Sequence, residues 1–397
     1  MSALPRSGDP AIVTPTPTAT RRRRGRGGAW GTVSGLAVVV ALLLGACGVG
    51  RAGPSEASPG DGTDELQTTD GTFPSVTFQV VSDRFQARLA EAGLADGLLI
   101  VESNRDGKLE SQTFGKGATT GSTTVPLAET SMLPTTVVLL SLVDEGTLSL
   151  DEPIGSTLRW LDGPAGAVTL RQLLSHTSGL PASVECAEPT PAACDAAIAA
   201  APLVEAPGEG FHVTDLDAHV AARLAETATG RPWSELFAER VAGPSGMTVT
   251  TYADPSTTGG LVAVDGTTTA DDLGRLLAVI RDGGVADNGA RVLSEESVRQ
   301  ILLDQTVRLD THTEAWVAET GVPTYGLGVW RDRLRGDDVA SVVSAPNRYG
   351  LYPFVDVGRS AWGIVVVDDR VAPRADAVSS SAVIAQLSAA ALRNSPD

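Results

Sequence analysis

The most constraining feature of this sequence is a helical segment that has no polar face. Residues 137–143 read V-V-L-L-S-L-V, and a helix that is apolar on almost every side is normally buried at the centre of a domain. Pro134 falls in the first turn, where its missing N–H costs no helical hydrogen bond, and Thr130 or Ser131 can cap the start. The chain has 397 residues, 42% of them hydrophobic, so it can surround this helix with a full-sized core.

The segments on either side of this helix predict further regular structure. Apolar residues repeat at helical spacing from Phe78, and two strands joined by a turn at residues 104–107 are expected over residues 98–101 and 108–114. A mostly helical middle follows from about residue 158 to 303. It has a break at Gly283-Gly284 and expected helices over residues 218–230, 232–241 and 294–303.

The last part of the chain predicts a return to strands. A final helix is expected over residues 376–393, after four short β-rich runs at residues 326–330, 339–343, 349–355 and 361–367. Strands and helices at both ends of a helical insertion indicate an α/β sandwich, in which an antiparallel sheet is flanked by terminal helices, together with an all-helical subdomain.

The first 46 residues are typical of an export signal. Arginines occupy residues 21–24 and 26, and the apolar run over residues 36–44 is too short to span a membrane comfortably. L-G-A-C at residues 44–47 resembles a bacterial lipobox, whose cysteine, here Cys47, would become the lipidated N-terminus. A plain signal peptide that ends near a cysteine is the alternative, and the export route, general or twin-arginine, stays open.

These features predict three parts of the chain. We expect a signal peptide over residues 1–46, a lipidated cysteine with a disordered tether rich in Gly, Pro, Ser and Thr over residues 47–75, and one domain over residues 76–397. The predicted location is the outer face of the bacterial cytoplasmic membrane, with acyl chains on Cys47 as the anchor.

The charge of the chain argues against some classes of partner. The whole chain has a formal net charge of −18, and because residues 1–46 contain six arginines and one aspartate, residues 47–397 carry −23. An acidic domain is a poor candidate for binding nucleic acid or anionic lipid headgroups. We therefore expect no nucleic-acid partner.

The other two cysteines predict a disulfide. Cys186 and Cys194 close a short proline-containing loop, and an exported domain is in a compartment that permits oxidation. A metal site is the alternative, but it needs more ligands, and the spacing typical of metal ligands is absent from the four histidines, His176, His212, His219 and His312. No metal or other cofactor is expected.

Five motifs in order resemble serine β-lactamases and DD-peptidases of the class C type. The motif L-V-D-E-G-T-L-S-L-D-E-P at residues 142–153 is similar to the end of the family's S-x-x-K helix. The others lie at residues 168–181 (V-T-L-R-Q-L-L-S-H-T-S-G-L-P), 207–211 (P-G-E-G-F), 230–247 (G-R-P-W-S-E-L-F and P-S-G-M) and 325–330 (Y-G-L-G-V-W). The resemblance spans nearly the whole domain and implies the β-lactamase/DD-peptidase-like fold, although a fold does not determine function.

The resemblance also implies where the first catalytic motif of an active member would lie. Counting back without a gap from Gly146, the nucleophilic serine corresponds to Glu129 and the lysine to Met132. The chain has only two lysines, Lys108 and Lys116, and both precede the helix, so neither S-x-x-K nor K-T-G occurs in the sequence.

The two remaining motifs of the family are altered as well. Y-x-N corresponds to Val213-Thr214-Asp215, and the strand with K-T-G or H-x-G corresponds to about Val343-Ser344-Ala345. Methionine and valine cannot transfer protons, and losing one member of such a coupled unit usually removes most of the rate. The sequence therefore predicts that the family's acyl-transfer mechanism has been lost.

Other side chains near these positions are weaker candidates for chemistry. Ser131 is a second possible nucleophile, but its third neighbour is Pro134, which cannot act as a base. His176 lies between Ser175 and Ser178, yet sequence neighbours rarely face one another productively. We include in the candidate pocket the polar residues nearest to the altered motifs, which are Ser131, Thr214, Ser344, Asn347, Arg348 and Tyr349.

Three charged side chains have both a functional and an ordinary interpretation. Glu129 and Asp215 would form a pair for acid–base work if the pocket keeps its usual shape, and Arg348 would bind a carboxylate. Alternatively, all three are solvated, or Glu129 only favours the positive end of a helix.

The function expected from the sequence is therefore binding. We predict a lipoprotein that recognises cell-wall material or another envelope protein without catalysis. The alternatives are a hydrolase with relocated catalytic residues and an inert platform for interactions.

Overall fold

The computed structural model describes residues 78–91, 93–105, 108–307, 309, 324–334 and 340–367. Three predictions fall outside these residues and stay predictions: the export signal with Cys47 and its tether, the tip of the first turn at residues 106–107, and the final helix over residues 376–393. In the described residues, no helix is both long and apolar enough to cross a membrane.

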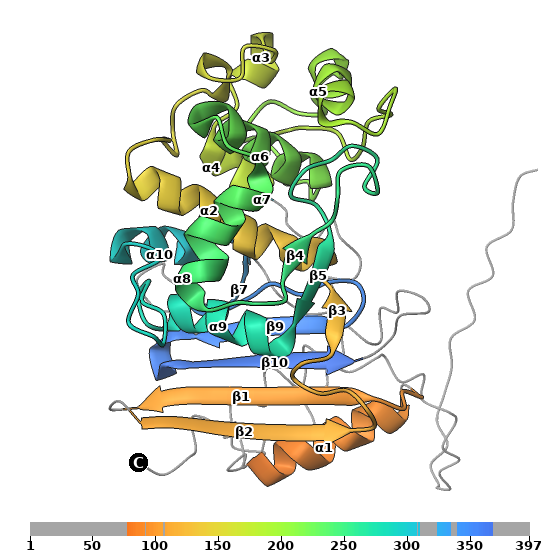
Figure 1. The fold of residues 1–397 in the computed structure, drawn as a ribbon, viewed down its shortest axis with the longest axis vertical. Coiled ribbons are helices and arrows are strands. Elements are labelled where there is room, and N and C mark those ends of the chain that lie inside the picture. Colours follow the sequence, from red (N-terminus) through yellow and green to blue (C-terminus); the bar gives the residue numbers. More distant parts are fainter. Residues whose placement is uncertain are drawn as a thin grey trace, which may run out of the picture. The chain divides into compact units, whose positions relative to one another are not determined.

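A seven-stranded antiparallel sheet forms one part of the domain (Figure 1). Its strands follow the order β2-β1-β10-β9-β8-β7-β6, so β1 and β10, which are far apart in the sequence, lie side by side. The bounds are β1 (Gly97–Arg105), β2 (Lys108–Lys116), β6 (Thr324–Tyr325), β7 (Trp330–Leu334), β8 (Ala340–Ser344), β9 (Leu351–Asp356) and β10 (Ala361–Val367). The structure confirms the antiparallel sheet that the sequence predicts.

Helices cover both faces of this sheet. Gly97 approaches α1 (Phe78–Glu91) so closely that a Cβ there would lie 2.8 Å from the Leu89 side chain. On β10, Trp362 lies against Gly274 of α9 (Ala270–Arg281). Because Gly97 pairs with Val367, and side chains alternate along a strand, Gly97 and Trp362 face opposite sides. Every residue of β10 is accordingly buried.

The apolar helix is α2 (Met132–Asp144), and its residues 132–142 are all buried, as the sequence predicts. The predicted caps are wrong. Ser131 already has helical dihedral angles and makes no capping hydrogen bond, because a 3₁₀ turn, η2 (Ala128–Ser131), leads directly into the helix. The Thr130 hydroxyl instead donates a hydrogen bond of 2.8 Å to the Ala345 carbonyl oxygen.

A mostly helical part packs around α2 (Figure 1). The predicted helices exist with shifted bounds. α6 begins three residues early, at Asp215, after its cap Thr214, and a π-helical turn ends the helix predicted over residues 232–241. Gly230 and Gly283-Gly284 have positive φ angles and end α6 and α9. The elements are η3 (Ile154–Ser156), α3 (Gly163–Gly166), α4 (Leu170–Leu174), α5 (Pro191–Ala200), α6 (Asp215–Thr229), α7 (Trp233–Phe237), η4 (Ala238–Ala242), α8 (Gly243–Ser245) and α10 (Glu295–Leu302).

Two predictions about strands need correction. The run at residues 326–330 is mainly a turn between β6 and β7, in which Gly328 has φ +70° and lies against Thr136 of α2. A small second sheet, in the order β3-β5-β4, interrupts the predicted helical middle. Its strands are β3 (Thr124–Pro126), β4 (Thr251–Tyr252) and β5 (Gly266–Thr269).

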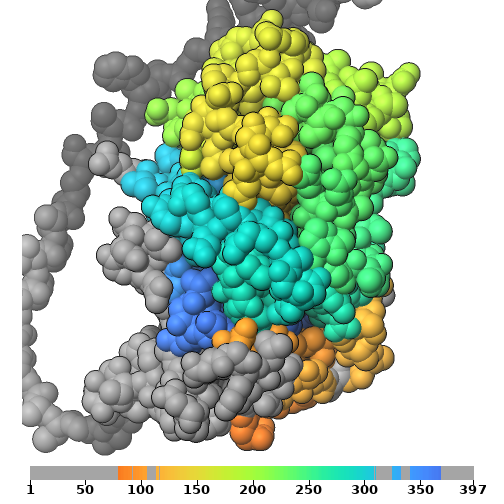
Figure 2. Space-filling model, turned by 60° about the vertical axis from the view of Figure 1, so that its left-hand side comes forward, coloured from red at the N-terminus to blue at the C-terminus, as the bar shows by residue number. Residues whose placement is uncertain are grey.

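The other predicted strands differ from the structure mainly at their ends. β8 and β9 begin one and two residues after the predicted starts, and a short 3₁₀ turn, η5 (Val357–Arg359), joins β9 to β10. In Figure 2 the segment that carries α9 and α10, coloured teal to cyan, lies between the yellow and green helical part and the orange strands.

The structure contains the predicted disulfide between Cys186 and Cys194. Cys194 belongs to α5, so the bond fastens the preceding loop to this helix.

Replacing both cysteines with alanine should destabilise the domain by about 2–3 kcal/mol, because a short loop is then unconstrained in the unfolded chain. Urea unfolding of the oxidised and reduced protein measures this difference. The double variant is the control, since its midpoint should not respond to a reductant. Equal midpoints for the oxidised wild type and the double variant would contradict the stabilising role.

Candidate functional site

A buried asparagine fastens the loop after β8 to the turn before α2. Asn347 is completely buried, and its Nδ2 donates hydrogen bonds of 3.0 Å to the carbonyl oxygens of Pro126 and Leu127. Its Oδ1 accepts hydrogen bonds from the backbone N–H groups of Tyr349 and Leu351. All of these bonds are internal, so Asn347 positions the site and its amide is not available to a ligand.

This fastening brings Glu129 and Arg348 together. The Arg348 backbone N–H donates to Glu129 Oε2 at 3.2 Å, and Nε and Nη2 of the guanidinium both contact Oε1. The Glu129 side chain is 11% exposed and that of Arg348 is 52% exposed. The hydrogen bond to Glu129 raises the pKa of Arg348. A pair this open to water stabilises a fold only weakly.

Asp215, the first residue of α6, completes what we term the Glu129–Arg348–Asp215 cluster. Its pKa is raised, first by the protein atoms that crowd it and next by the negative charge of Glu129, while Arg348 and His176 act in the opposite direction. Water nevertheless reaches this residue.

The other positions implied by the resemblance are apolar and largely buried. Met132 is buried at the start of α2, and Val343 is buried within β8. Val213 is half-buried and packs against the aromatic cluster of Phe211, Tyr325 and Trp330.

The predicted pocket residues divide into two groups. Arg348 belongs to the cluster, but several of the others have structural partners. Thr214 caps α6 and donates to the Pro181 carbonyl oxygen at 3.0 Å, and Ser344 donates to the Tyr352 hydroxyl at 3.3 Å. Ser131 is buried, and Tyr349 is half-buried beside Asn347.

His176 is held in a buried polar network that has the wrong order for catalysis by a serine. Its Nδ1 lies 2.8 Å from one carboxylate oxygen of Asp217, and the Ser178 hydroxyl donates to the other oxygen at 2.5 Å. Burial raises the pKa of Asp217, while its bond to His176 acts against this. The carboxylate therefore separates the histidine from the serine, and the network ties α6 to the segment after α4.

Sequence reasoning missed Tyr252. Its hydroxyl lies 2.8 Å from Thr135 Oγ1 and donates to the Ser131 carbonyl oxygen at 3.1 Å. Burial raises the pKa of this phenol strongly. The two-residue strand β4 that carries Tyr252 is too short to give a periodic signal in the sequence.

Comparison with known proteins gives a family for this arrangement. The model of the "Beta-lactamase" family matches residues 83–386, which is more than half of the chain. In three dimensions, a β-lactamase-like protein of Bacteroides dorei superimposes with a TM-score of 0.68 at 25% identity, covering 78% of this chain and 98% of its own.

Curated relatives match over shorter regions. Protein Rv1367c of Mycobacterium tuberculosis is 30% identical over 240 residues, which are 43% of this chain and 57% of that protein. The D-alanyl-D-alanine-carboxypeptidase/endopeptidase AmpH of Escherichia coli K12 is 30% identical over 145 residues, 32% of this chain and 36% of that protein. The chain therefore spans roughly half the length of Rv1367c and roughly one third of the length of AmpH.

The cluster makes a prediction about the titration of Asp215. Replacing Glu129 with glutamine should lower the pKa of Asp215, because a neighbouring negative charge is removed, and replacing Arg348 with glutamine should raise it. Carboxyl-carbon NMR titration measures both shifts, with Glu188→Gln as an exposed control.

The same shift has a consequence for stability. Since the folded pKa is raised, the stability that protonated Asp215 provides at low pH is lost as the pH rises through that pKa. An Asp215 pKa that responds to neither variant would show that the three charges do not interact.

Proposed function

This chain belongs to the β-lactamase family, and we propose that it is an exported, lipid-anchored member that binds a cell-envelope ligand without catalysing acyl transfer. The observation that carries the proposal is the ion pair of Glu129 with Arg348 at the place where the resemblance puts the nucleophile. A carboxylate held by a guanidinium is a poor substitute for an activated serine.

The groups around Glu129 support the loss of catalysis. Met132, one helical turn on, is a buried thioether and cannot accept a proton. Val213 presents a hydrocarbon side chain where the resemblance places the tyrosine that shuttles protons. Nucleophile, base and shuttle depend on one another in the family's mechanism, so replacing all three removes the reaction.

The half-exposed guanidinium of Arg348 supports a binding role. An arginine recognises a carboxylate through two parallel hydrogen bonds, and here an incoming carboxylate would compete with Glu129 for the same donors. The relative AmpH is named for its action on D-alanyl-D-alanine. A peptide that ends in D-alanyl-D-alanine is therefore the ligand class that we propose, and another envelope protein is the alternative.

A hydrolase with relocated residues is the second candidate. The raised pKa of Asp215 beside Glu129 favours it, because two carboxyl groups with different protonation states can share acid–base work. The bond of Glu129 to Arg348 weighs against it, since this carboxylate is already bound to the guanidinium.

Fluorescent penicillin should leave the purified chain unlabelled, because no activated serine is available at Glu129. In-gel fluorescence measures the labelling, with an active penicillin-binding protein as the positive control. Stoichiometric labelling would refute the proposal. If such labelling disappeared in Ser131→Ala, the hydrolase with a relocated nucleophile would be correct.

A peptide ending in D-alanyl-D-alanine should bind, and Arg348→Ala should weaken this binding by about tenfold, because the carboxylate loses a charged partner. Calorimetric titration measures the affinity. Arg299→Ala is the matched control, since Arg299 is likewise 52% exposed and pairs with a glutamate. Equal losses in the two variants, or no binding by the wild type, would contradict the role of Arg348.

A further inference from the structure

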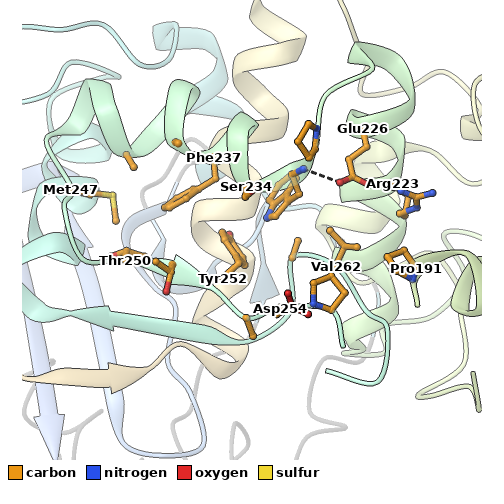
Figure 3. A pocket seen from close by; sticks show the side chains of 18 of the residues that line it. Pro191, Arg223, Glu226, Ser234, Phe237, Met247, Thr250, Tyr252, Asp254 and Val262 are labelled. Carbon is orange, nitrogen blue, oxygen red and sulfur yellow. Dashed lines mark hydrogen bonds and ion pairs between the residues drawn. The ribbon is translucent and has the colours of Figure 1, made fainter. Parts of the chain in front are cut away.

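A pocket of about 630 Å³ lies beside α7 (Figure 3), and none of the Glu129–Arg348–Asp215 cluster lines it. Its walls come from α6, α7, η4, β4 and the residues that follow β4, together with Val262 and Ala263. This volume is in the range of pockets that hold small organic ligands. Neither the altered motifs nor the proposed peptide site uses these residues.

Aromatic side chains form one part of the pocket wall. The rings of Trp233 and Phe237 stand at 79° and 84° to the ring of Tyr252, with centroids 5.5 Å and 5.2 Å from it. Figure 3 shows Phe237 and Met247 toward one end of the pocket, with Tyr252 beside them. Aromatic rings and a thioether offer polarizable surfaces, and the faces of such rings attract cations.

Charged side chains gather toward the other end. Figure 3 shows Arg223, Glu226 and Asp254 on the side where Pro191 and Val262 lie. Arg223 is bound to two carboxylates, since it forms ion pairs with both Asp195 and Glu226. Its single positive charge is therefore more than balanced within the protein.

The carboxylate of Asp254 adds a further negative charge to this end. It accepts hydrogen bonds of 2.5 Å from the Ser256 hydroxyl and 2.8 Å from the Ser256 backbone N–H. The bond from the hydroxyl is the main cause of a lowered pKa, so Asp254 stays ionised at neutral pH. The pocket thus combines an aromatic end with an end that has an excess of negative charge.

We propose that this pocket binds an organic cation that carries an apolar body. The apolar part packs against Phe237, Met247 and the ring of Tyr252, while the positive group lies toward Asp254 and over an aromatic face. The excess negative charge of the pocket disfavours an organic anion of the same size.

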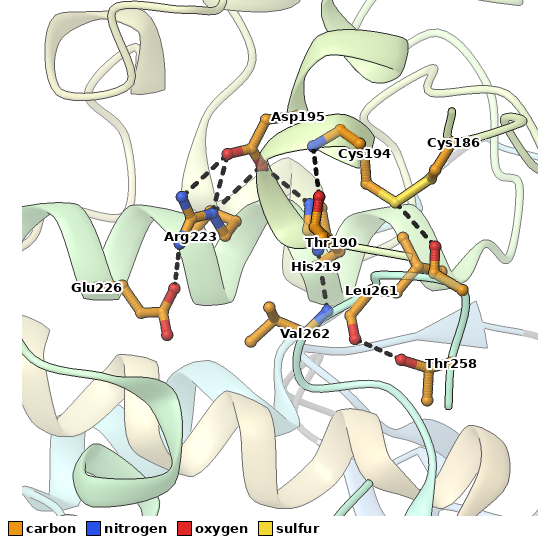
Figure 4. A network of polar contacts seen from close by, with 12 residues as sticks. Cys186, Thr190, Cys194, Asp195, His219, Arg223, Glu226, Thr258, Leu261 and Val262 are labelled. Carbon is orange, nitrogen blue, oxygen red and sulfur yellow. Dashed lines mark hydrogen bonds and ion pairs between the residues drawn. A yellow bond between two sulfur atoms is a disulfide. The ribbon is translucent and has the colours of Figure 1, made fainter. Parts of the chain in front are cut away.

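The charged end of the pocket is already held in place by the protein itself (Figure 4). The Val262 backbone N–H donates to His219 Nδ1 at 2.9 Å, so the proton of this neutral ring is on Nε2, which donates to Asp195 at 3.0 Å. Asp195 also accepts a hydrogen bond from the Arg223 guanidinium. It directly follows Cys194 in α5, and Cys194 is bonded to Cys186 by the disulfide. A preformed wall lowers the entropic cost of binding.

Tyr252 connects this pocket to the start of α2. Its ring lines the pocket, and its hydroxyl binds the Ser131 carbonyl oxygen. The pocket nevertheless lacks all three residues of the Glu129–Arg348–Asp215 cluster. The inference is therefore independent of the proposed peptide binding, and Arg348→Ala should leave cation binding unchanged.

Titrating the purified full-length chain with benzyltrimethylammonium and, separately, with phenylacetate tests the proposal. Both probes carry a benzyl group, but their charges are opposite. Calorimetry or saturation-transfer NMR should detect binding of the cation and much weaker binding of the anion. Equal binding of the two probes, or no binding of the cation up to about 10 mM, would overturn the proposal.

Variants show whether the cation occupies this pocket. Ala238 is an exposed lining residue, so Ala238→Trp should fill the pocket and abolish binding while the fold is kept. Asp254→Asn should weaken binding of the cation about threefold, and Asp162→Asn, at an exposed aspartate outside the pocket, should not. Cation binding that persists in Ala238→Trp and is unchanged in Asp254→Asn would place the cation elsewhere.

Discussion

Burial of α2 is the constraint on which the rest of the structure depends. Since residues 132–142 are all buried, this helix needs protein on every side. Gly328, at φ +70°, allows the turn between β6 and β7 to lie against Thr136. On another part of the helix, the Tyr252 hydroxyl bonds to Thr135 and Ser131. A helix held in this way fixes the position of the residues that directly precede it.

Those residues determine the chemistry of the site. Asn347 and Thr130 bind the loop after β8 to the turn before α2, and this brings Arg348 to Glu129. The fold thus places the ion pair of Glu129 with Arg348 at the position where the resemblance to the family implies a nucleophile. A pair whose arginine is half-exposed contributes only about 0–1 kcal/mol to stability, so a ligand carboxylate can replace Glu129 at little cost to the fold.

The sequence predicts most of the architecture but not the short elements. The sequence predicts β10 with its correct bounds, because its last four residues, Ile364 to Val367, are all β-branched and give a strong signal. The strands β4 and β5 have two and four residues, too few for a period, so the small sheet was missed. Ser131 has the residue type of a cap, but the preceding 3₁₀ turn already gives it helical dihedral angles.

The candidate site was predictable only where a resemblance gave the positions. Counting from the family's motifs led to Glu129 and Asp215, and the structure brings both close to Arg348. The role of Asn347 depends on bonds to residues about 220 positions earlier, and no local pattern reports such bonds. The aromatic pocket likewise combines segments whose only connection is the fold.

The central claim is that an ion pair has taken the place of an activated nucleophile. Intact-protein mass spectrometry after incubation with a serine-reactive phosphonate tests this claim most directly, because it detects any covalent adduct on the whole chain. The account predicts an unchanged mass, under conditions in which an active family member is fully modified. A stoichiometric increase by one phosphonyl group would contradict it.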